Sequence, residues 1–495
     1  MERPALPYLV TQRAWKVSRK DIEKAFRCSG NSSPGPDGIS FAIWRACKGL
    51  ASSILLDVAN ELEEDHAERD MIDAYADESA EGEHDFNLST LVCLPKTPTG
   101  EDVELGVYHA PADTRPLSIV NCDNRLVASA MVSRWEIHIS RFVSLRQQGF
   151  LKGRSILKNL LEVDDAMAFG ALNEEAAAAV FLDFSAAFPS ISQEYVQACL
   201  RHLGIPDSAL NSFSNLYSRS RCRISMQGKS YDGFALQSGV RQGCPMSPII
   251  YALVAEVLLD NLQSIDRDLL LRAYADDTAI VVRNLYETGP KLAEAFHDFE
   301  QVSGLKLNLR KSIIVALSND DNTDITRRKN LAIPRWADMP VQTFCKYLGF
   351  YLGPGKKDKS WLAPMNKFRE RVKMWAGQPL GLYWNTRVFN TFCLPVLSYV
   401  AQLESPPQWV VLEVEALMRK LAPGPTGWAS IKDLQLLDET FGFSASFHNL
   451  EWTSKAAQIR VLLCDSGCLP RTVFLTRVKA LSRNISTTGD NSPLG

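Results

Sequence analysis

Three aspartates stand beside apolar, strand-like runs, and this placement points to metal chemistry. Asp183 directly follows Ala178–Leu182, a continuous apolar run typical of a buried central strand. Asp276–Asp277 separate two further β-rich runs, Leu269–Tyr274 and Thr278–Val282, as at the tip of a hairpin. An ionised carboxylate in apolar surroundings needs a partner, and a bound cation is the partner that also creates a function.

The two groups of acids would meet if the strand and the hairpin were neighbours in one sheet. Two divalent ions about 3.5 to 4 Å apart, bridged by such carboxylates, stabilise the attacking and leaving oxygens of a phosphoryl displacement. Hard oxygen ligands favour Mg²⁺, with Mn²⁺ as a possible substitute. A Tyr-x-Asp-Asp match alone is weak, since Asp also favours turns. The prediction depends on Asp183 and Asp276 coming together.

Several other elements are predicted from periodicity and breakers. Leu88–Leu94 is strand-like and stops at Pro95, and Asn319–Lys329 is polar and predicted to be a loop. The remaining expectations are helices over Ile39–Leu56 and Asn124–Trp135, a strand over Leu117–Val120, and a strand pair around Lys346–Gly353.

Net charge over the 495 residues is −3, but the charge is unevenly distributed. Residues 57–85 hold 13 acidic residues against one Arg and carry −12, so the rest of the chain carries +9. A basic body suits a nucleic-acid partner, because the phosphate backbone is anionic. The 46% hydrophobic and 22% charged residues exclude collagen-like and wholly disordered classes.

Cationic density peaks between Lys346 and Lys373, with eight Lys or Arg against two acids. Three aromatic residues, Tyr347, Trp361 and Phe368, interleave with these cations, as expected where bases stack. The equally plausible alternative is a solvated helix face whose aromatic residues belong to the core. The predicted nucleic-acid contacts are Lys367, Arg369, Arg371 and Lys373.

Eleven scattered Cys suggest free thiols in a reducing compartment. No apolar run approaches the roughly 18 residues of a membrane span, and the first ten residues lack the features of a secretory signal. We therefore expect an intracellular protein, in the nucleus or the cytoplasm, without a membrane partner.

A series of motifs, taken in order, resembles the reverse transcriptase of non-LTR retrotransposons. The resemblance extends from about Ser32 to Trp428. Its motifs are Ser33–Gly38, Leu94–Lys96 with Asp113–Ser118, Gln147–Phe150 with Gly153–Ser155, Phe181–Phe188, Gly239–Pro248, Tyr274–Asp277, Ser303–Asn308 with Lys311, and Lys346–Gly349.

The resemblance implies an α+β fold of the right-hand polymerase type, with fingers, a palm in which an antiparallel sheet packs on helices, and a helical thumb. The implied boundaries are a leader over 1–30, fingers over 31–170 with the acidic insertion near 57–85, and a palm over 171–345. A basic thumb follows over 346–481, and a polar tail over 482–495. The implied partners are an RNA template, a DNA or RNA primer and dNTPs.

The resemblance also assigns roles. Asp183 and Asp276 would bind two metal ions together with the carbonyl of Phe184, and Asp277 would be a weaker ligand. The residues implied for dNTP binding are Lys96 and Arg115 on the triphosphate, Phe188 against the sugar, and Gln242 with Gly243 in a turn close to the nucleotide. Lys311 would protonate the leaving pyrophosphate, with Lys306 as the competing candidate.

Two departures from the family pattern leave alternatives open. Pro189 stands where the family commonly has Asp, and we expect Ser190 and Gln193 to form a capping box just beyond it. No segment resembles the endonuclease of many such elements, so we expect nicking to be supplied elsewhere or lost. The alternatives to the polymerase are a relic that binds RNA or RNA–DNA duplex without polymerising, and an RNA-dependent RNA polymerase with the same palm.

Overall fold

The computed structural model describes residues 12–465, apart from 66–85 and the single or paired positions 97, 103, 105, 174–175, 319 and 426. Most of the acidic segment, and the expected polar tail, lie outside the described residues. The chain divides into two compact units. Unit 1 comprises 1–155, 174–314 and 323–341, and unit 2 comprises 156–173, 315–322 and 342–495.

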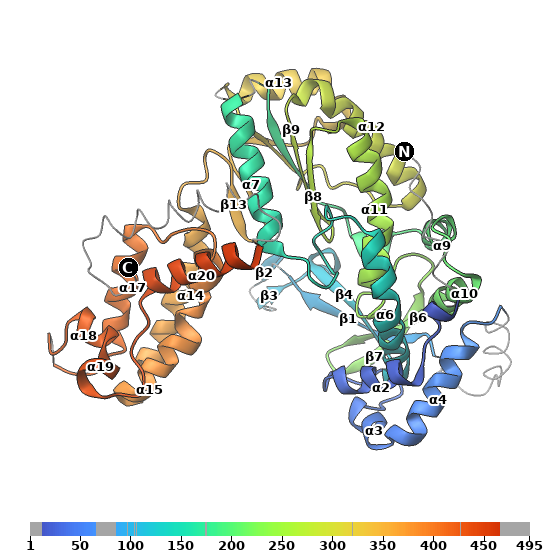
Figure 1. Ribbon diagram of the computed structural model, residues 1–495, viewed down its shortest axis with the longest axis horizontal. Helices are drawn as coiled ribbons and strands as arrows, with labels where there is room; N and C mark the ends of the chain where they lie inside the picture. Colours follow the sequence, from blue (N-terminus) through green and yellow to red (C-terminus); the bar gives the residue numbers. More distant parts are fainter. Residues whose placement is uncertain are drawn as a thin grey trace. The chain divides into compact units, whose positions relative to one another are not determined.

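A five-stranded sheet forms the centre of unit 1, in the order β11-β10-β5-β9-β8. Two of its strands, β8 and β9, are labelled in Figure 1. β5 is fully buried, as its apolar sequence predicts, and it pairs antiparallel with β9. β8 and β9 form the predicted hairpin. The strands are β5 (Ala178–Leu182), β8 (Leu270–Tyr274), β9 (Asp277–Val282), β10 (Ile313–Ala316) and β11 (Val341–Gln342).

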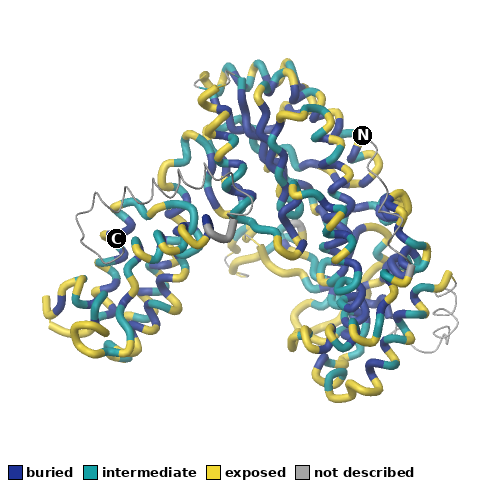
Figure 2. Tube along the Cα trace, in the orientation of Figure 1, coloured by how far each residue is buried: buried dark blue, intermediate teal, exposed yellow. Residues whose placement is uncertain are grey.

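Two long helices cover this sheet. α11 (Ser247–Ile265) has Pro248 in its first turn. α12 (Leu285–Ser303) begins where the Asn284 side chain accepts hydrogen bonds from the backbone N–H groups of Tyr286 and Glu287. Gly304, at φ 74°, ends α12. By length and composition α11 could cross a membrane, but most of it is buried in the core of unit 1, as the dark blue tube in Figure 2 shows.

A second sheet of unit 1, in the order β4-β1-β6-β7, has β1 antiparallel to β4 and parallel to β6. β7 is exposed along its whole length. The strands are β1 (Leu88–Pro95), β4 (Thr114–Val120), β6 (Arg221–Met226) and β7 (Lys229–Ala235), and a separate pair consists of β2 (Gly100–Asp102) and β3 (Gly106–Tyr108).

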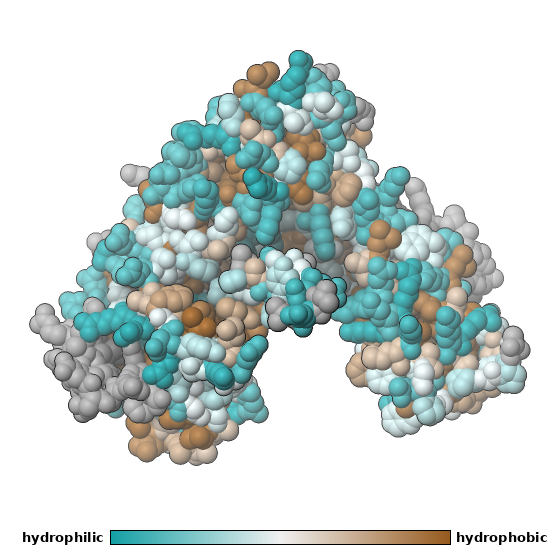
Figure 3. All heavy atoms as spheres, turned by 180° about the vertical axis from the view of Figure 1, so that it is seen from behind, coloured by the Kyte–Doolittle hydropathy of each residue, from teal (hydrophilic) through white to brown (hydrophobic). Residues whose placement is uncertain are grey.

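The N-terminal helices pack on the long helix α6 (Cys122–Phe142). Trp15, Ile22 and Phe26 are buried there, so part of the expected leader contributes to the core. Figure 3 shows an apolar patch over α3 and α4, where Ile43 and Leu50 are exposed. These helices are α1 (Gln12–Trp15), α2 (Arg19–Cys28), α3 (Phe41–Ala46) and α4 (Lys48–Glu61); the others of unit 1 are α8 (Ala187–Ser190), α9 (Gln193–His202), α10 (Asp207–Tyr217) and α13 (Asn322–Ala332).

Unit 2, as far as its residues are described, is mainly helical and contains one small strand pair. β12 (Cys345–Tyr347) and β13 (Phe350–Leu352) form the predicted pair, joined at Leu348–Gly349. The helices are α7 (Ile156–Asn173), α14 (Lys359–Ala376), α15 (Gly381–Val388), α16 (Pro395–Ala401), α17 (Gln408–Lys420), α18 (Ile431–Gln435), α19 (Leu437–Phe441) and α20 (Leu450–Asp465).

Two local predictions are wrong. Residues 322–329 of the polar segment that was expected to be a loop are helical and belong to α13. The Lys329 side chain is buried and donates to the carbonyls of Trp336, Ala337 and Met339. The capping box at Ser190 does not form. Instead Ser192 caps α9, its side chain accepting the N–H of Tyr195 at 3.2 Å.

Candidate active site

The palm sheet brings the three predicted carboxylates together. Leu182 pairs with Thr278, so Asp183, one residue beyond β5, lies beside the hairpin tip that carries Asp276 and Asp277. The three charges are near enough to influence one another's pKa. The adjacency required by the sequence argument is therefore present.

Backbone hydrogen bonds fix the end of β5. The N–H of Asp183 donates to the Ser312 hydroxyl at 3.1 Å, and the carbonyl of Asp183 accepts from the N–H of Asn308 at 2.8 Å. The N–H of Ser185 donates to the carbonyl of Lys306 at 2.8 Å. In this antiparallel bridge the flanking groups make the bonds, so the carbonyl of Phe184 is directed away from the segment 306–308.

All three carboxylates resist ionisation. The pKa of Asp183 is raised because burial removes water from it and Asp276 repels its charge, whereas Lys311 and Lys96 lower it. The pKa of Asp276 is raised by burial and partly offset by Arg115. The side chain of Asp277 is exposed. Nevertheless, loss of water to the surrounding protein, and after it repulsion by Asp276 and Asp183, raise the pKa of Asp277 to about 6. Like charges held at one place need cations to neutralise them.

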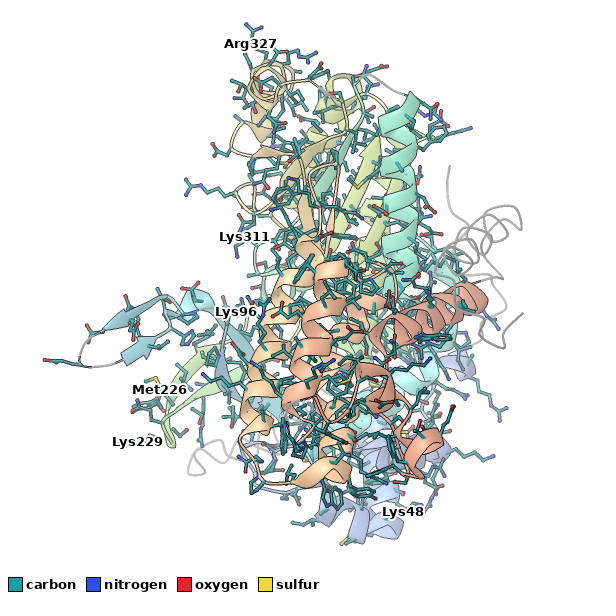
Figure 4. All side chains as sticks on the ribbon, turned by 90° about the vertical axis from the view of Figure 1, so that its left-hand side faces the viewer. Lys48, Lys96, Met226, Lys229, Lys311 and Arg327 are labelled. Carbon is teal, nitrogen blue, oxygen red and sulfur yellow. The ribbon has the colours of Figure 1, made fainter. Side chains whose placement is uncertain are left out.

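The predicted cations surround these acids. Lys96 follows β1, Arg115 lies on β4, and Lys311 precedes β10; all three are exposed. Figure 4 shows Lys96 and Lys311 on the same side of unit 1, far from Lys48 and Arg327 at its two ends. The competing Lys306 forms an ion pair with Glu300 at 3.6 Å, which favours Lys311 as the residue near the acids.

Phe188 packs against two other aromatic side chains, Tyr251 and Phe150. Its ring stacks on the buried Tyr251 at 5.1 Å between centroids, and Phe150 meets it edge-on at 5.8 Å. Phe188 itself is only partly buried. Its ring is therefore oriented by two neighbours while part of it remains free for a ligand, which differs from an ordinary core Phe.

The turn at Gln242–Gly243 is joined to β4. The carbonyl of Gln242 accepts from the N–H of Ser118 at 2.8 Å. Gly243 has a φ of 118°, and a Cβ atom there would lie 2.7 Å from the carbonyl oxygen of Ser118. Only glycine fits this position, and the contact that requires it is with β4 itself. The glycine also remains exposed, as expected of backbone that approaches a ligand.

Hard carboxylate oxygens suit divalent cations, so the chemistry of the site fits the expected metal. Within the part of the chain that the structure describes, no three His, Cys, Asp or Glu side chains are gathered as in a closed metal site. Residues that would hold ions here are Asp183, Asp276, Asp277 and the carbonyl of Phe184.

The cations of the basic window, which is the segment 346–373, lie in different environments. Lys367 and Arg371 line a groove of about 450 Å³ together with Lys346. Arg369 instead donates to both carboxylate oxygens of Glu413, at 2.5 and 2.7 Å, and Lys373 is exposed. The groove is thus cationic, and Arg369 is already neutralised.

The expectation that bases stack on the aromatic residues of this window is wrong. Tyr347, Trp361 and Phe368 are 4%, 1% and 0% exposed, so they form the core of unit 2. Trp361 and Phe368 lie on α14 and Tyr347 lies on β12, and buried rings at these positions are not accessible to a base. The alternative of core aromatic residues holds for these three side chains.

The antiparallel sheet, the acid-tipped hairpin and the covering helices define a polymerase palm. Residues 95–352, more than half of the chain, match the family model described as reverse transcriptase (RNA-dependent DNA polymerase). The chain belongs to the reverse transcriptase family. Enzymes of this family generally use divalent metal ions.

Curated relatives are polyproteins of non-LTR retrotransposons. The chain is 26% identical over 321 residues to the Pol polyprotein of the type-2 element R2DM of Drosophila melanogaster, covering 64% of this chain and 28% of that protein. It is 24% identical over 329 residues to a type-1 R2 Pol polyprotein of Popillia japonica, covering 63% and 45%. The chain thus spans less than half the length of these relatives.

Solved telomerase structures show a weaker likeness. Telomerases from Candida albicans and Candida tropicalis, each with a TWJ fragment of telomeric RNA, are 10% and 9% identical, with TM-scores of 0.40 and 0.41. The matches cover 76% and 80% of this chain and 61% and 64% of those chains. The family assignment rests on the sequence match and not on these scores.

Some functional candidates emerge only from the structure. Lys346 shares the basic groove, and Tyr251 and Phe150 orient Phe188. Phe150 and Lys346 belong to the motif segments Gln147–Phe150 and Lys346–Gly349, so the sequence already marked these two positions. It gave no sign of the contacts that they make.

Proposed function

We propose that this chain is the RNA-directed DNA polymerase of a non-LTR retrotransposon, which adds dNTPs to a primer 3′-hydroxyl on an RNA template. The observation that carries the proposal is the meeting of Asp183, Asp276 and Asp277, surrounded by cations, in a chain of the reverse transcriptase family. The template, a DNA or RNA primer and dNTPs are the proposed partners.

We propose that Asp183 and Asp276 hold two Mg²⁺ ions, that Asp277 and the carbonyl of Phe184 assist, and that Mn²⁺ can substitute. When bound, such ions stabilise the charge on the attacking and leaving oxygens of phosphoryl transfer. The raised pKa of each acid supports this role, because each carboxylate gains most when a cation replaces lost water. The sheet supplies the alignment through the end of β5 and the hairpin tip.

The remaining residues act on the dNTP. Lys96 and Arg115 are proposed to bind the triphosphate, since both lie in the electrostatic field of the acids. Lys311 is proposed to give its proton to the leaving pyrophosphate oxygen. Phe188 would exclude a ribose 2′-hydroxyl, and the turn at Gln242–Gly243 would let backbone approach the nucleotide.

In unit 2, we propose that the groove at Lys346, Lys367 and Arg371 binds the phosphate backbone of the nucleic acid. Three cations around a groove of about 450 Å³ suit phosphate oxygens. Arg369 is left out of this role, because Glu413 already neutralises its guanidinium group.

Primer extension tests the proposal. The purified protein should extend oligo(dT) on poly(A) with dTTP and Mg²⁺, and Asp183→Asn or Asp276→Asn should abolish extension without lowering the melting temperature. Asp298→Asn, at an exposed aspartate on α12, is the matched control and should retain activity. A wild-type protein that binds the duplex but never extends it would instead support the non-polymerising relic.

A further inference from the structure

A buried glutamine spans the distance between the loop 143–155 and the acid-tipped hairpin. Gln147 is 0% exposed, and its side chain binds both backbone groups of Ala275, the residue before Asp276. We propose that Gln147 is a positioning residue, which fixes the turn of the hairpin and thereby aims the carboxylate of Asp276. The expected effect on catalysis rests on the proposed function, whereas the hydrogen bonds of Gln147 are independent of it.

The Gln147 amide uses both its acceptor and its donor. Its Oε1 accepts from the N–H of Ala275 at 2.9 Å and from the N–H of Gly149 at 2.9 Å. Its Nε2 donates to the carbonyl of Ala275 at 3.1 Å. One side chain thus satisfies both backbone groups of a residue 128 positions away, which leaves that residue little freedom to rotate.

The turn needs such support. Ala275 has a φ of 60°, in the left-handed region that residues with a Cβ atom rarely adopt. A strained residue directly before Asp276 could relax and rotate the carboxylate away from Asp183. The bonds from Gln147 oppose this relaxation, because rotation of Ala275 would break both of them.

The backbone around Gln147 makes the support rigid. The N–H of Ala273 donates to the carbonyl of Arg146 at 2.8 Å, and the N–H of Gln148 donates to the carbonyl of Ala273 at 2.7 Å. This segment therefore extends the palm sheet along the free edge of β8. Gly149 lies so close to the turn that a Cβ atom there would collide with the backbone nitrogen of Ala275.

Two arginines anchor the loop to its surroundings. Arg146 forms an ion pair with the buried Glu256 of α11 at 2.8 Å and a second one with Asp260. Arg154 donates to four backbone carbonyls of the loop and of the end of α6, those of Ser140, Val143, Ser144 and Gln147. The loop also carries Phe150, whose ring meets the ring of Phe188, so the segment that contacts the acidic turn also contacts Phe188.

The principal test is Gln147→Met, which keeps the length of the side chain and removes all three hydrogen bonds. Gln148→Met is the matched control. Gln148 is 2% exposed in the same loop, and its amide binds Leu145 and Ser155 without contacting the hairpin. Both variants lose buried amide bonds, so a purely structural effect should be similar in the two.

Hydrogen exchange of the full chain, without metal or substrate, measures directly whether Gln147 holds Ala275 in place. In Gln147→Met, exchange at the amide of Ala275 should be at least about tenfold faster than in wild type, while β5 remains protected. In Gln148→Met the Ala275 amide should exchange as in wild type. Equal exchange in wild type and Gln147→Met would overturn the proposal.

Steady-state kinetics tests whether the loss of these hydrogen bonds impairs the function of Asp276. Gln147→Met should lower kcat by about 10- to 100-fold, as for other residues that orient a metal ligand, with KM for dNTP changed less than about twofold. Gly149→Ala, which retains Gln147 but pushes the turn, should also lower kcat. A kcat in Gln148→Met as low as in Gln147→Met would contradict a positioning role. If the wild-type chain never incorporates dNTP, the proposed function is wrong. The exchange experiment still tests whether Gln147 fixes the turn at Ala275.

Discussion

Removing one negative charge from the acidic site should stabilise the metal-free protein while impairing catalysis. In the folded chain Asp277 loses water and lies beside Asp276 and Asp183, which together raise its pKa from 3.8 to about 6. Since the folded state binds the proton more tightly than the unfolded state, ionisation of Asp277 costs folding free energy. The cost is full above about pH 7 and disappears as the pH falls from about 6 to about 4. Asp277→Asn removes it.

The magnitude follows from the size of the shift. About two pKa units correspond to about 3 kcal/mol at full value. Because the side chain of Asp277 is exposed, screening by solvent reduces this to about 1 kcal/mol. For a unit of this size, that gain should raise the melting temperature by about 2 °C.

Thermal unfolding in EDTA is the assay. Asp277→Asn should melt about 2 °C above wild type at pH 7.5, and the gain should shrink to roughly half at pH 5, where wild-type Asp277 is mostly protonated in the folded state. Mg²⁺ should then stabilise wild type more than the variant, because the ions pair with the carboxylates. A variant that melts below wild type at pH 7.5, or a gain equal at both pH values, would refute the reasoning.

Phe188→Val should raise incorporation of ribonucleotides relative to dNTPs by about 10- to 100-fold in primer extension, at a stability cost of about 1 to 3 kcal/mol from two lost ring contacts; an unmoved ratio would remove Phe188 from the site. Lys367→Gln and Arg371→Gln should each flatten the log–log salt dependence of duplex binding by about one unit, measured by fluorescence anisotropy, whereas Arg369→Gln should leave the slope unchanged. Deleting residues 66–85 should tighten duplex binding in the same assay with extension retained, and a soluble but inactive deletion variant would contradict this.

The sequence was sufficient to predict that the three aspartates lie close together. A continuous apolar run such as Ala178–Leu182 has few alternatives to a buried strand, and two β-rich runs around Asp276–Asp277 can close only as a hairpin. Local patterns of this kind are encoded by adjacent residues. The motif order then supplied the pairing between elements that are distant in sequence.

Features that depend on long-range contacts could not be predicted in this way. The bonds of Gln147 to Ala275 join residues 128 positions apart and leave no periodic pattern. Aromatic residues beside cations have the same composition whether they face a base or a core, and burial of Trp361 decided between the two. The helix α13 was missed because its polar sequence gave no apolar period, while the fold used the buried Lys329 to bind carbonyls.

The central claim is that Asp183 and Asp276 hold the divalent ions of nucleotide addition. Electron paramagnetic resonance of Mn²⁺, titrated into the protein with a primer–template and an unreactive dNTP analogue, counts bound ions directly. Wild type should bind two Mn²⁺ more per chain than the double variant Asp183→Asn, Asp276→Asn, with duplex binding equal in both proteins. The same number of bound Mn²⁺ in the two proteins would contradict the claim.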